Sequence, residues 1–334
     1  MPHCSTFTLN PQWHGESSVA AAPRERRPGA PRVAMALAGA PDRVCSSARE
    51  PAVVGTAWQP GPPRGLGAGK VNFITVTGDD DTRSYISDKL KGYGVETKLV
   101  IDDSRPTTLK QRYRVDNKTL LRVSHLRQHK INKTLQRKMR DHVFAALDCT
   151  DLLIFSDFNY GVLPQDLVDE ISSECTRRGI MVVADSQSSS QVGNVSRFKN
   201  TALLTPTERE ARLAMGNYED GLVVLAEALR KKTNALNIAI TLGAEGVLIH
   251  AGHSDKTQWL TDRLPTLNTA PKDTAGASDS LLVCTAMALA LGRSVWESLY
   301  LGSLAAACQV GRIGNIPLTA AEILIETQKK NGIY

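Results

Sequence analysis

The sequence lacks the features that mark several large classes of protein. None of its six cysteines forms a CxxC pair, which argues against both a zinc ribbon and a disulfide framework. No stretch reaches the roughly 18 uncharged apolar residues that a membrane span needs. The start of the chain does not show a charged segment followed by an apolar one, as a secretory signal would. We therefore expect a cytoplasmic protein with no membrane partner.

Aromatic residues and net charge are also low. Aromatics make up 5% of the 334 residues, and 40 Lys and Arg against 34 Asp and Glu leave a net charge of +6. Apolar residues account for 42% and charged residues for 22%, which are ordinary values for a globular protein with a sizeable core. This length allows one large α/β domain or two small ones.

The first 69 residues differ from the rest in composition. Residues 1–70 contain 10 of the 16 prolines, 12 alanines and seven arginines, but no isoleucine and no tyrosine. A segment rich in Pro, Ala and Arg and poor in aromatics is typical of poorly ordered chain. We therefore divide the chain into an atypical segment, 1–69, and a folded domain, 70–334.

From residue 71 onward, strand and helix patterns alternate. The strand patterns cover 71–77, 95–101, 151–156, 180–185, 202–205, 237–243 and 246–251. The helix patterns cover 81–94, 133–147, 164–178, 219–232, 279–291, 294–312 and 319–330, and Pro206 and Thr207 open a further helix. This alternation predicts an α/β fold with a mostly parallel central sheet sandwiched by helices. A hairpin at about 105–124 is too polar for that sheet, so we expect it to form a small β lid.

The most informative motif is PKDTAGASDSLLVCTAMALALG, residues 271–292. Backbone N–H groups around Gly276, Ala277 and Ser278 would converge at the start of an apolar helix, where the helix dipole favours anions. Asp279 would then lie in the first turn, where its carboxylate could accept the proton of an attacking hydroxyl during phosphoryl transfer. The alternative is that Asp273 or Asp279 only caps the helix.

Within this motif, DTAGASDS resembles the DTxGAGD signature of the ribokinase/PfkB carbohydrate kinases. Other segments occur in the order of that family: ADSQ (184–187) is similar to VDPK, TPTEREA (205–211) to TPNxxEA, and ITLGAEGVLI (240–249) to a TxGxxG nucleotide loop. The resemblance covers residues 70–330. It implies a ribokinase-like fold and an ATP-dependent kinase that phosphorylates a hydroxyl of a sugar or sugar phosphate.

Two segments resemble the heptose-phosphate kinase branch of this family. They are SDFNYGVL (156–163), similar to SDYxKGxL, and RPTTLKQRYRVDNKTLLRV (105–123), similar to TTxKxR…LLR. The resemblance therefore implies a heptose-7-phosphate-like substrate, and Asp157 in the first segment is a candidate substrate-binding residue.

The family resemblance assigns further roles residue by residue. It implies that Asp279 is the general base, and that the backbone of Ala275, Gly276, Ala277 and Ser278 forms the anion hole for the transferring phosphoryl group. It implies that Thr207, Glu208, Arg209, Glu210, Gly243 and Gly246 bind ATP, with Glu210 also helping to hold Mg²⁺ through water. The two glycines would let the chain approach the nucleotide where a Cβ would obstruct it.

A strongly basic run extends from Lys110 to Arg140, with 11 Lys and Arg against Asp116 alone. It is either a solvated face or a site for an anionic substrate, in which Lys110, Arg112 and Arg122 lie near a sugar phosphate. Nucleic acid is disfavoured as a partner, because Tyr113 is the only aromatic in the run and stacking platforms are lacking.

Departures from the family patterns occur at Ser278, Thr207 and Tyr160, among others. Ser278 replaces the second glycine of GAGD, at a cost of about 1 kcal/mol if the position needs a positive φ. Thr207 replaces an asparagine, and Tyr160 replaces a lysine. These departures leave open a non-catalytic relative that binds nucleotide or sugar phosphate, and another small-molecule kinase of the ribokinase or fructokinase type.

The upstream part of the family pattern is not intact. RRPGAPRVAMALAGA (26–40) partly matches the helix pattern GGAANVAxNLAxLGA, and residues 41–65 look foreign to the fold. WQPGPPRG (58–65) can be encoded by codons that, read one base later, give the NLAxLG part of that helix. We therefore hypothesise a shifted reading frame and expect residues 1–66 to add no complete strand to the central sheet. The expected partner is a small-molecule sugar or sugar phosphate, with a homodimer and a functional link to a sugar nucleotidyltransferase left open.

Overall fold

The computed structural model describes residues 32–38, 41–46, 54–56, 65–115, 118–188, 192–252, 259–314 and 316–330. Its main sheet consists of β1 (Arg32–Ala38), β4 (Lys70–Thr77), β5 (Glu96–Ile101), β8 (Leu152–Asp157), β9 (Met181–Ser186), β10 (Leu203–Leu204), β11 (Asn237–Thr241), β12 (Val247–Gly252) and β13 (Trp259–Leu264). The nine strands lie in the order β13-β12-β11-β10-β9-β8-β1-β4-β5. All neighbours pair in parallel except β11 with β12 and β12 with β13. The predicted mostly parallel sheet is confirmed.

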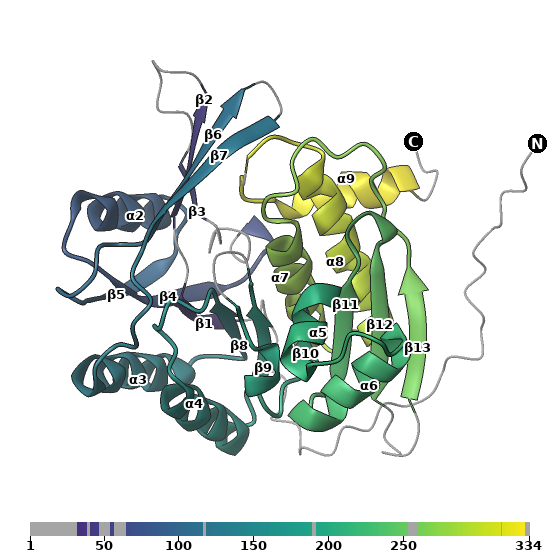
Figure 1. The fold of residues 1–334 in the computed structure, drawn as a ribbon, viewed down its shortest axis with the longest axis horizontal. Coiled ribbons are helices and arrows are strands. Elements are labelled where there is room, and N and C mark those ends of the chain that lie inside the picture. Colours follow the sequence, from purple (N-terminus) through teal and green to yellow (C-terminus); the bar gives the residue numbers. More distant parts are fainter. Residues whose placement is uncertain are drawn as a thin grey trace, which may run out of the picture.

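Helices cover both faces of this sheet (Figure 1). One face carries α3 (Lys133–Leu147), α4 (Gln165–Arg178), α5 (Glu208–Met215) and α6 (Leu222–Thr233). The other carries α2 (Asp81–Gly92), α7 (Ala277–Ala290) and α8 (Val295–Val310), and α9 (Ala320–Lys330) packs against α8. Two short 3₁₀ helices, η1 (Val195–Arg197) and η2 (Gly243–Glu245), lie in connections.

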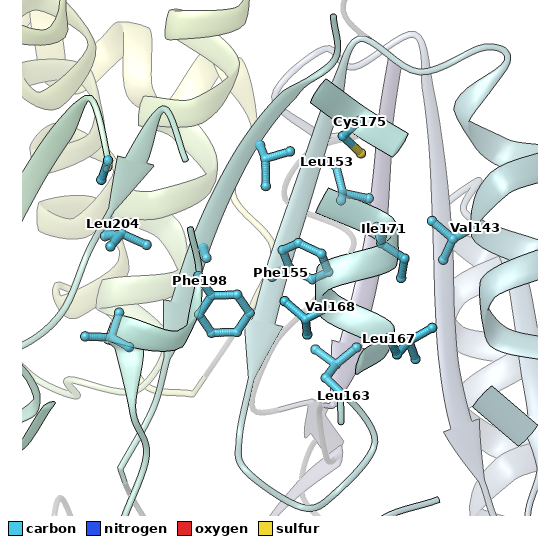
Figure 2. Close-up of a cluster of buried hydrophobic side chains, with 14 of the residues drawn as sticks. Val143, Leu153, Phe155, Leu163, Leu167, Val168, Ile171, Cys175, Phe198 and Leu204 are labelled. Atoms are coloured by element: carbon cyan, nitrogen blue, oxygen red, sulfur yellow. The ribbon is translucent and has the colours of Figure 1, made fainter. Parts of the chain in front are cut away.

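The two core layers follow from the alternation of side chains along each strand. In β8, Leu153 and Phe155 pack with α3 and α4, whereas Leu152 and Ile154 pack with α7 on the opposite face. Figure 2 shows Phe155 among the side chains of α4 and beside Phe198, whose ring centroid is 5.4 Å away. Each such side chain stabilises the fold by about 1.5–3 kcal/mol when it is fully buried. A strand that is buried on both faces therefore needs a continuous apolar sequence.

The helix α7 lies in the interior of the protein. Most of its residues are buried, including Asp279 in its first turn, which explains why its sequence is apolar on nearly all sides. It packs closely on α8 at Gly302, where a Cβ would lie 2.7 Å from the carbonyl oxygen of Leu281 and closer still to Thr285 Oγ1. This packing fixes the start of α7 relative to the sheet.

A second sheet stands away from the main one, at the upper left of Figure 1. It consists of β2 (Pro41–Ser46), β3 (Val54–Thr56), β6 (Leu109–Val115) and β7 (Lys118–His125), in the order β3-β2-β6-β7. Strands β6 and β7 form the antiparallel hairpin that the sequence predicts. The hairpin is therefore part of a four-stranded lid sheet, in which β2 pairs parallel to β6.

The prediction that residues 1–66 add no complete strand to the central sheet is wrong. Strand β1 lies inside that sheet and pairs in parallel with both β4 and β8, and Val33 and Ala34 are fully buried. The comparison of residues 26–40 with a helix is wrong as well for Arg32–Ala38. Burial on both faces of a parallel sheet favours this apolar run as a strand, although alanine and methionine are good helix formers.

The expectation that residues 41–65 are foreign to the fold is wrong for Pro41–Ser46 and Val54–Thr56, which pair in the lid sheet. Further expectations for the first segment lie outside the described residues. Poor order was predicted for residues 1–69, and positions 1–31 together with the gaps up to residue 64 are not described. Over the ranges given above, no helix is long and apolar enough to cross a membrane. The edge strand β13 was not predicted, because only half of WLTDRL is apolar.

Candidate active site

The candidate site lies where the carboxyl ends of β8, β9, β10 and β11 meet the first turns of α5 and α7. An isolated parallel bridge joins Thr207 to Thr241, and the Thr241 N–H donates to the carbonyl of Pro206 over 2.9 Å. The TPTEREA segment and the glycine loop after β11 therefore lie side by side. In parallel α/β sheets, this edge is where ligands bind.

The start of α7 is shaped by the Asp273–Gly276 turn. Gly276 is the N-cap residue in the left-handed region, with φ 78° and ψ 4°. Asp273 supports the turn, because its Oδ1 accepts from the Ala275 N–H and its Oδ2 from the Gly314 N–H, both over 3.1 Å. The positive φ required by this turn falls on a glycine, so Ser278, which is helical, brings no backbone strain.

The four residues of the predicted anion hole are not equivalent. The Ala275 N–H already donates to Asp273 Oδ1, and the Ala277 N–H points to the carbonyl of Thr274 at 3.3 Å. Over the part of the chain that the structure describes, the N–H groups of Gly276 and Ser278 make no hydrogen bond to protein. These two groups at a helix N-terminus are the better donors for an anion.

Asp279 lies one helical position after Ser278 and is 6% exposed. Its Oδ1 accepts a hydrogen bond of 3.0 Å from Gln187 Nε2, at the end of β9. The Gln187 N–H in turn donates to the carbonyl of Asp157 over 2.8 Å, which connects the site to the end of β8. Asp279 is therefore held from the sheet and does not cap its own helix.

Asp185 is a third acid beside Asp279 and Glu210. It lies one residue before the end of β9 and is 2% exposed. Burial raises the pKa of Asp185 well above its ordinary value of 3.8, and the negative charges of Glu210 and Asp279 raise it further. A proton held on Asp185 reduces the repulsion among these three carboxyl groups.

The start of α5 is fixed by a capping box between Thr207 and Glu210. Thr207 Oγ1 accepts from the Glu210 N–H over 3.2 Å, and Glu210 Oε2 accepts from the Thr207 N–H over 2.8 Å. Threonine therefore serves as the N-cap where the family pattern has asparagine. Glu210 Oε1 accepts a hydrogen bond of 2.6 Å from the Ser188 N–H, which ties α5 to the segment after β9.

A pocket of about 480 Å³ opens beside α5. Its lining residues come from α5 and from the loop after β11: Thr207, Glu208, Arg209, Arg212, Leu213, Tyr218, Thr241, Leu242 and Gly243. Four of the six residues predicted to bind ATP line it, namely Thr207, Glu208, Arg209 and Gly243. Glu210 and Gly246 lie outside this lining.

The two glycines of the TLGAEG loop differ in their surroundings. Gly243 has φ 60°, and no atom lies within 4 Å of the place where a Cβ would be. Gly246 has φ 98°, and a Cβ there would overlap the backbone of Leu264 and Pro265. Gly243 therefore faces open space that a ligand can use, whereas Gly246 is needed for the close approach of the β13 segment.

The lid contributes Lys110 to the junction with the main sheet. Lys110 is 8% exposed, and its Nζ lies 4.5 Å from the ring centroid of Phe158 and 5.3 Å from that of Tyr160. This cation–π contact attaches the lid to the segment after β8. Arg112 and Arg122 stand opposite each other in the register of β6 and β7.

Asp157 is engaged within the protein. It is 1% exposed, its Oδ2 forms an ion pair of 2.8 Å with Arg197, and its Oδ1 accepts from the Asn159 N–H over 2.9 Å. Asn159 has a positive φ of 60°, so this hydrogen bond supports a strained turn. Asp157 therefore stabilises the turn at Asn159 and the contact with Arg197. Substrate binding by Asp157 stays a prediction.

A match to a family model shows which family the chain belongs to. The model described as pfkB family carbohydrate kinase matches residues 64–321, which is more than half of the chain. The chain belongs to the pfkB family of carbohydrate kinases. The resemblance inferred from DTAGASDS and the accompanying segments is therefore confirmed, as is the predicted class of ATP-dependent sugar kinase.

The curated relatives that match this chain are longer than the matched region. The chain is 29% identical over 262 residues to bifunctional protein HldE of Helicobacter hepaticus, covering 77% of this chain and 52% of that protein. It is 30% identical over 271 residues to bifunctional protein HldE of Campylobacter fetus subsp. fetus, covering 79% of this chain and 56% of that protein. The chain thus spans about half the length of these pfkB relatives.

Solved structures confirm the ribokinase-like fold. Phosphofructokinase-2 from Escherichia coli aligns with a TM-score of 0.70 at 15% identity, covering 90% of this chain and 99% of that chain. Ribokinase from Thermotoga maritima aligns with a TM-score of 0.68 at 19% identity, covering 89% and 99%. At these identities the likeness concerns the fold of pfkB kinases alone.

Sequence reasoning did not find every residue of the candidate site. Asp185 and Gln187 belong to the ADSQ segment, which resembles a family pattern but received no functional role from the sequence. The available signal was a run of polar residues directly after an apolar strand. Gln309 on α8 was not found at all; its Nε2 donates to the carbonyls of Ala275 and Gly314. Only the packing of α8 on α7 reveals it.

Proposed function

We propose that this chain transfers the γ-phosphoryl group of ATP to a hydroxyl of a heptose-7-phosphate-like sugar phosphate, with Asp279 as the general base. In this reaction the hydroxyl proton moves to Asp279, the oxygen forms a bond to the γ-phosphorus, and the bond from that phosphorus to the β–γ bridging oxygen breaks. The products are ADP and the new phosphate ester. Asp279 gives up its proton when product leaves.

The observation that carries this proposal is the position of Asp279. Its carboxyl group is buried in the first turn of α7, directly after the N–H groups of Gly276 and Ser278. An anionic phosphoryl group held by these N–H groups would lie beside the carboxylate. The hydroxyl that attacks it would then be within reach of the base.

ATP is the phosphoryl donor of the pfkB family, and the pocket beside α5 supports a nucleotide site next to the start of α7. Arg209 lines this pocket, is exposed, and lies in the first turn of α5, where a cation opposes the helix dipole unless an anion is bound nearby. Thr207, Glu208 and Gly243 complete the contacts expected for ATP.

Mg²⁺ binding through water fits the acids that are present. Among the described residues, no group of three or more His, Cys, Asp or Glu side chains could hold a metal directly. Glu210 has both oxygens engaged in hydrogen bonds to Ser188 and Thr207, so it would hold a hydrated ion. When bound, Mg²⁺ would neutralise charge on the ATP phosphates.

The substrate class rests on the two segments that resemble the heptose-phosphate kinase branch and on the basic lid. Arg112 and Arg122 lie side by side on β6 and β7, where two cations can position a phosphate. The relatives carry the name bifunctional, which fits the predicted functional link to a sugar nucleotidyltransferase.

The test is ADP release from ATP·Mg²⁺ with a panel of plain sugars and sugar phosphates, with and without the Asp279→Asn change. We expect turnover with a phosphorylated heptose and little with plain sugars. Turnover with ribose or fructose instead would indicate another kinase of the family. Binding of ATP·Mg²⁺ without turnover on any sugar would indicate a non-catalytic relative. A chain with the hypothesised reading frame restored over residues 1–69 tests whether that segment limits activity.

A further inference from the structure

Gln187 holds the carboxyl group of Asp279 through a hydrogen bond. Its side-chain Nε2 donates to Asp279 Oδ1 over 3.0 Å, across 92 residues of sequence. Its own backbone is fixed on both sides, because its N–H donates to the carbonyl of Asp157 over 2.8 Å and its carbonyl accepts from Asn159 Nδ2 over 2.9 Å. The amide is therefore presented to Asp279 from a rigid position at the end of β9.

The surroundings of Asp279 are rich in acids. Asp185 on β9 interacts electrostatically with Asp279 and also with Glu210 on α5. Asp273 lies in the turn before α7, where its carboxylate accepts the N–H groups of Ala275 and Gly314. On α8, Gln309 is uncharged, and its Nε2 donates to the carbonyl of Ala275 in the turn before α7.

The donor that reaches Asp279 Oδ1 is a neutral amide. Gln187 occupies the position where the VDPK pattern has lysine. A lysine would also orient the carboxylate, but its positive charge would stabilise the ionised form and weaken the base. An amide orients the carboxylate through a hydrogen bond but adds no positive charge, so the negative charges of the neighbouring acids still disfavour ionisation of Asp279.

We propose that Gln187 is a positioning residue for phosphoryl transfer: its amide holds the Asp279 carboxylate in the orientation that meets the substrate hydroxyl, and its neutrality keeps that carboxylate a strong enough base. This inference rests on the proposed function of Asp279. It adds a residue, outside the motif that contains the base, on which the rate would depend.

The first test separates orientation from charge. Gln187→Leu removes the amide and is expected to lower kcat roughly 10- to 100-fold while the KM for ATP stays within about twofold. Gln187→Lys keeps an N–H donor and is expected to retain more of kcat than Gln187→Leu. The matched control is Gln136→Leu on α3, which removes the hydrogen bond from the Gln136 side-chain amide to the carbonyl of Ile131 and is expected to keep kcat.

The second test is the pH profile of kcat, which a merely structural residue would not shift. Gln187→Lys is expected to move the acidic limb to lower pH, because the cation favours the ionised base. Gln187→Glu is expected to move that limb to higher pH, because a further negative charge disfavours ionisation. If Gln187→Leu keeps kcat, or if neither charged variant moves the limb, the proposal is overturned.

A third measurement keeps the inference testable apart from the proposed function. If the parent chain transfers phosphate to no sugar in the panel, the proposed function fails. NMR with ¹³C-labelled aspartate then measures the pKa of Asp279 in the parent, Gln187→Lys and Gln187→Glu chains. This measurement tests the contact between Gln187 and Asp279 without any need for activity. Shifts of the Asp279 pKa in opposite directions in the two variants support the contact; an unchanged pKa in both overturns it.

Discussion

His250 Nε2 lies 2.9 Å from Glu227 Oε2, which joins the middle of β12 to α6 in a buried contact. His250 is fully buried, and its Nδ1 lies 2.7 Å from Thr261 Oγ1 on β13. Glu227 also accepts from Arg230 Nε over 2.7 Å. Both the histidine and the carboxylate therefore titrate differently in the folded and unfolded chains.

The first prediction concerns the stability of this contact in acid. Burial lowers the pKa of His250 below its ordinary 6.5, so the unfolded chain binds the proton more readily. Burial alone would raise the pKa of Glu227, but hydrogen bonds from Arg230 and His250 lower it from 4.5 to about 2. The free energy of unfolding should therefore fall as the pH drops below 6.5, and again between 4.5 and about 2.

Urea unfolding at several pH values on either side of 6.5 measures this effect. The His250→Gln chain should lose part of the stability at neutral pH and should show a smaller fall on acidification. His142 is exposed on α3, so His142→Gln is the control and should follow the parent chain. An equal pH dependence in the parent and in His250→Gln would contradict the prediction.

The second prediction concerns Asp279→Asn. The change is nearly isosteric and keeps an acceptor for Gln187, so stability should hardly change, while the loss of proton acceptance should lower kcat by roughly 10² to 10⁴. Thermal unfolding, ATP binding and kcat are measured together. Asp81 lies in the first turn of α2 and is exposed, and Asp81→Asn should keep full activity. If Asp279→Asn keeps more than about a tenth of kcat, Asp279 is not the base.

The third prediction concerns the lid. If Arg112 and Arg122 bind a substrate phosphate, alanine at either position should raise the KM for a sugar phosphate by about 10- to 150-fold, since a charge-assisted contact is worth roughly 1.5–3 kcal/mol. Lys110→Ala should have this effect as well and should also weaken the attachment of the lid to Phe158 and Tyr160. The KM for ATP should stay nearly unchanged in all three.

Arg137, exposed on α3 in the same basic run, provides the control for charge alone. Arg137→Ala should leave the KM for the sugar phosphate unchanged. If alanine at Arg112 or Arg122 raises the KM equally for phosphorylated and plain sugars, these arginines belong to a solvated face and not to a phosphate site.

The fourth prediction concerns the contact between α7 and α8. Gly302→Ala places a Cβ against the backbone of Leu281 and the side chain of Thr285, so it should lower the free energy of unfolding by about 1–3 kcal/mol. It should also lower kcat, because α7 carries Asp279. At Gly92, by contrast, a Cβ meets no atom within 4 Å, so Gly92→Ala should keep or slightly raise stability. Denaturant unfolding of both chains checks this difference.

Much of the fold could be predicted from local patterns. The hairpin of β6 and β7 and the start of α5 at Thr207 follow from side-chain alternation and capping chemistry, which depend on residues only a few positions apart. Strand β1 could not be predicted this way. Its alanines and methionine suit a helix, and only the space between β4 and β8 makes it a strand.

The sequence by itself determined most of the order of strands and helices from residue 71 onward, the motif that supplies Asp279, and the membership of the pfkB family. The tertiary structure alone decided which side chains meet. It placed Gln187 against Asp279, directed Lys110 onto the rings of Phe158 and Tyr160, and joined Asp157 to Arg197. The physical reason is that periodicity and capping act within a turn or a strand, whereas these contacts join residues that only the parallel sheet and its helices bring together.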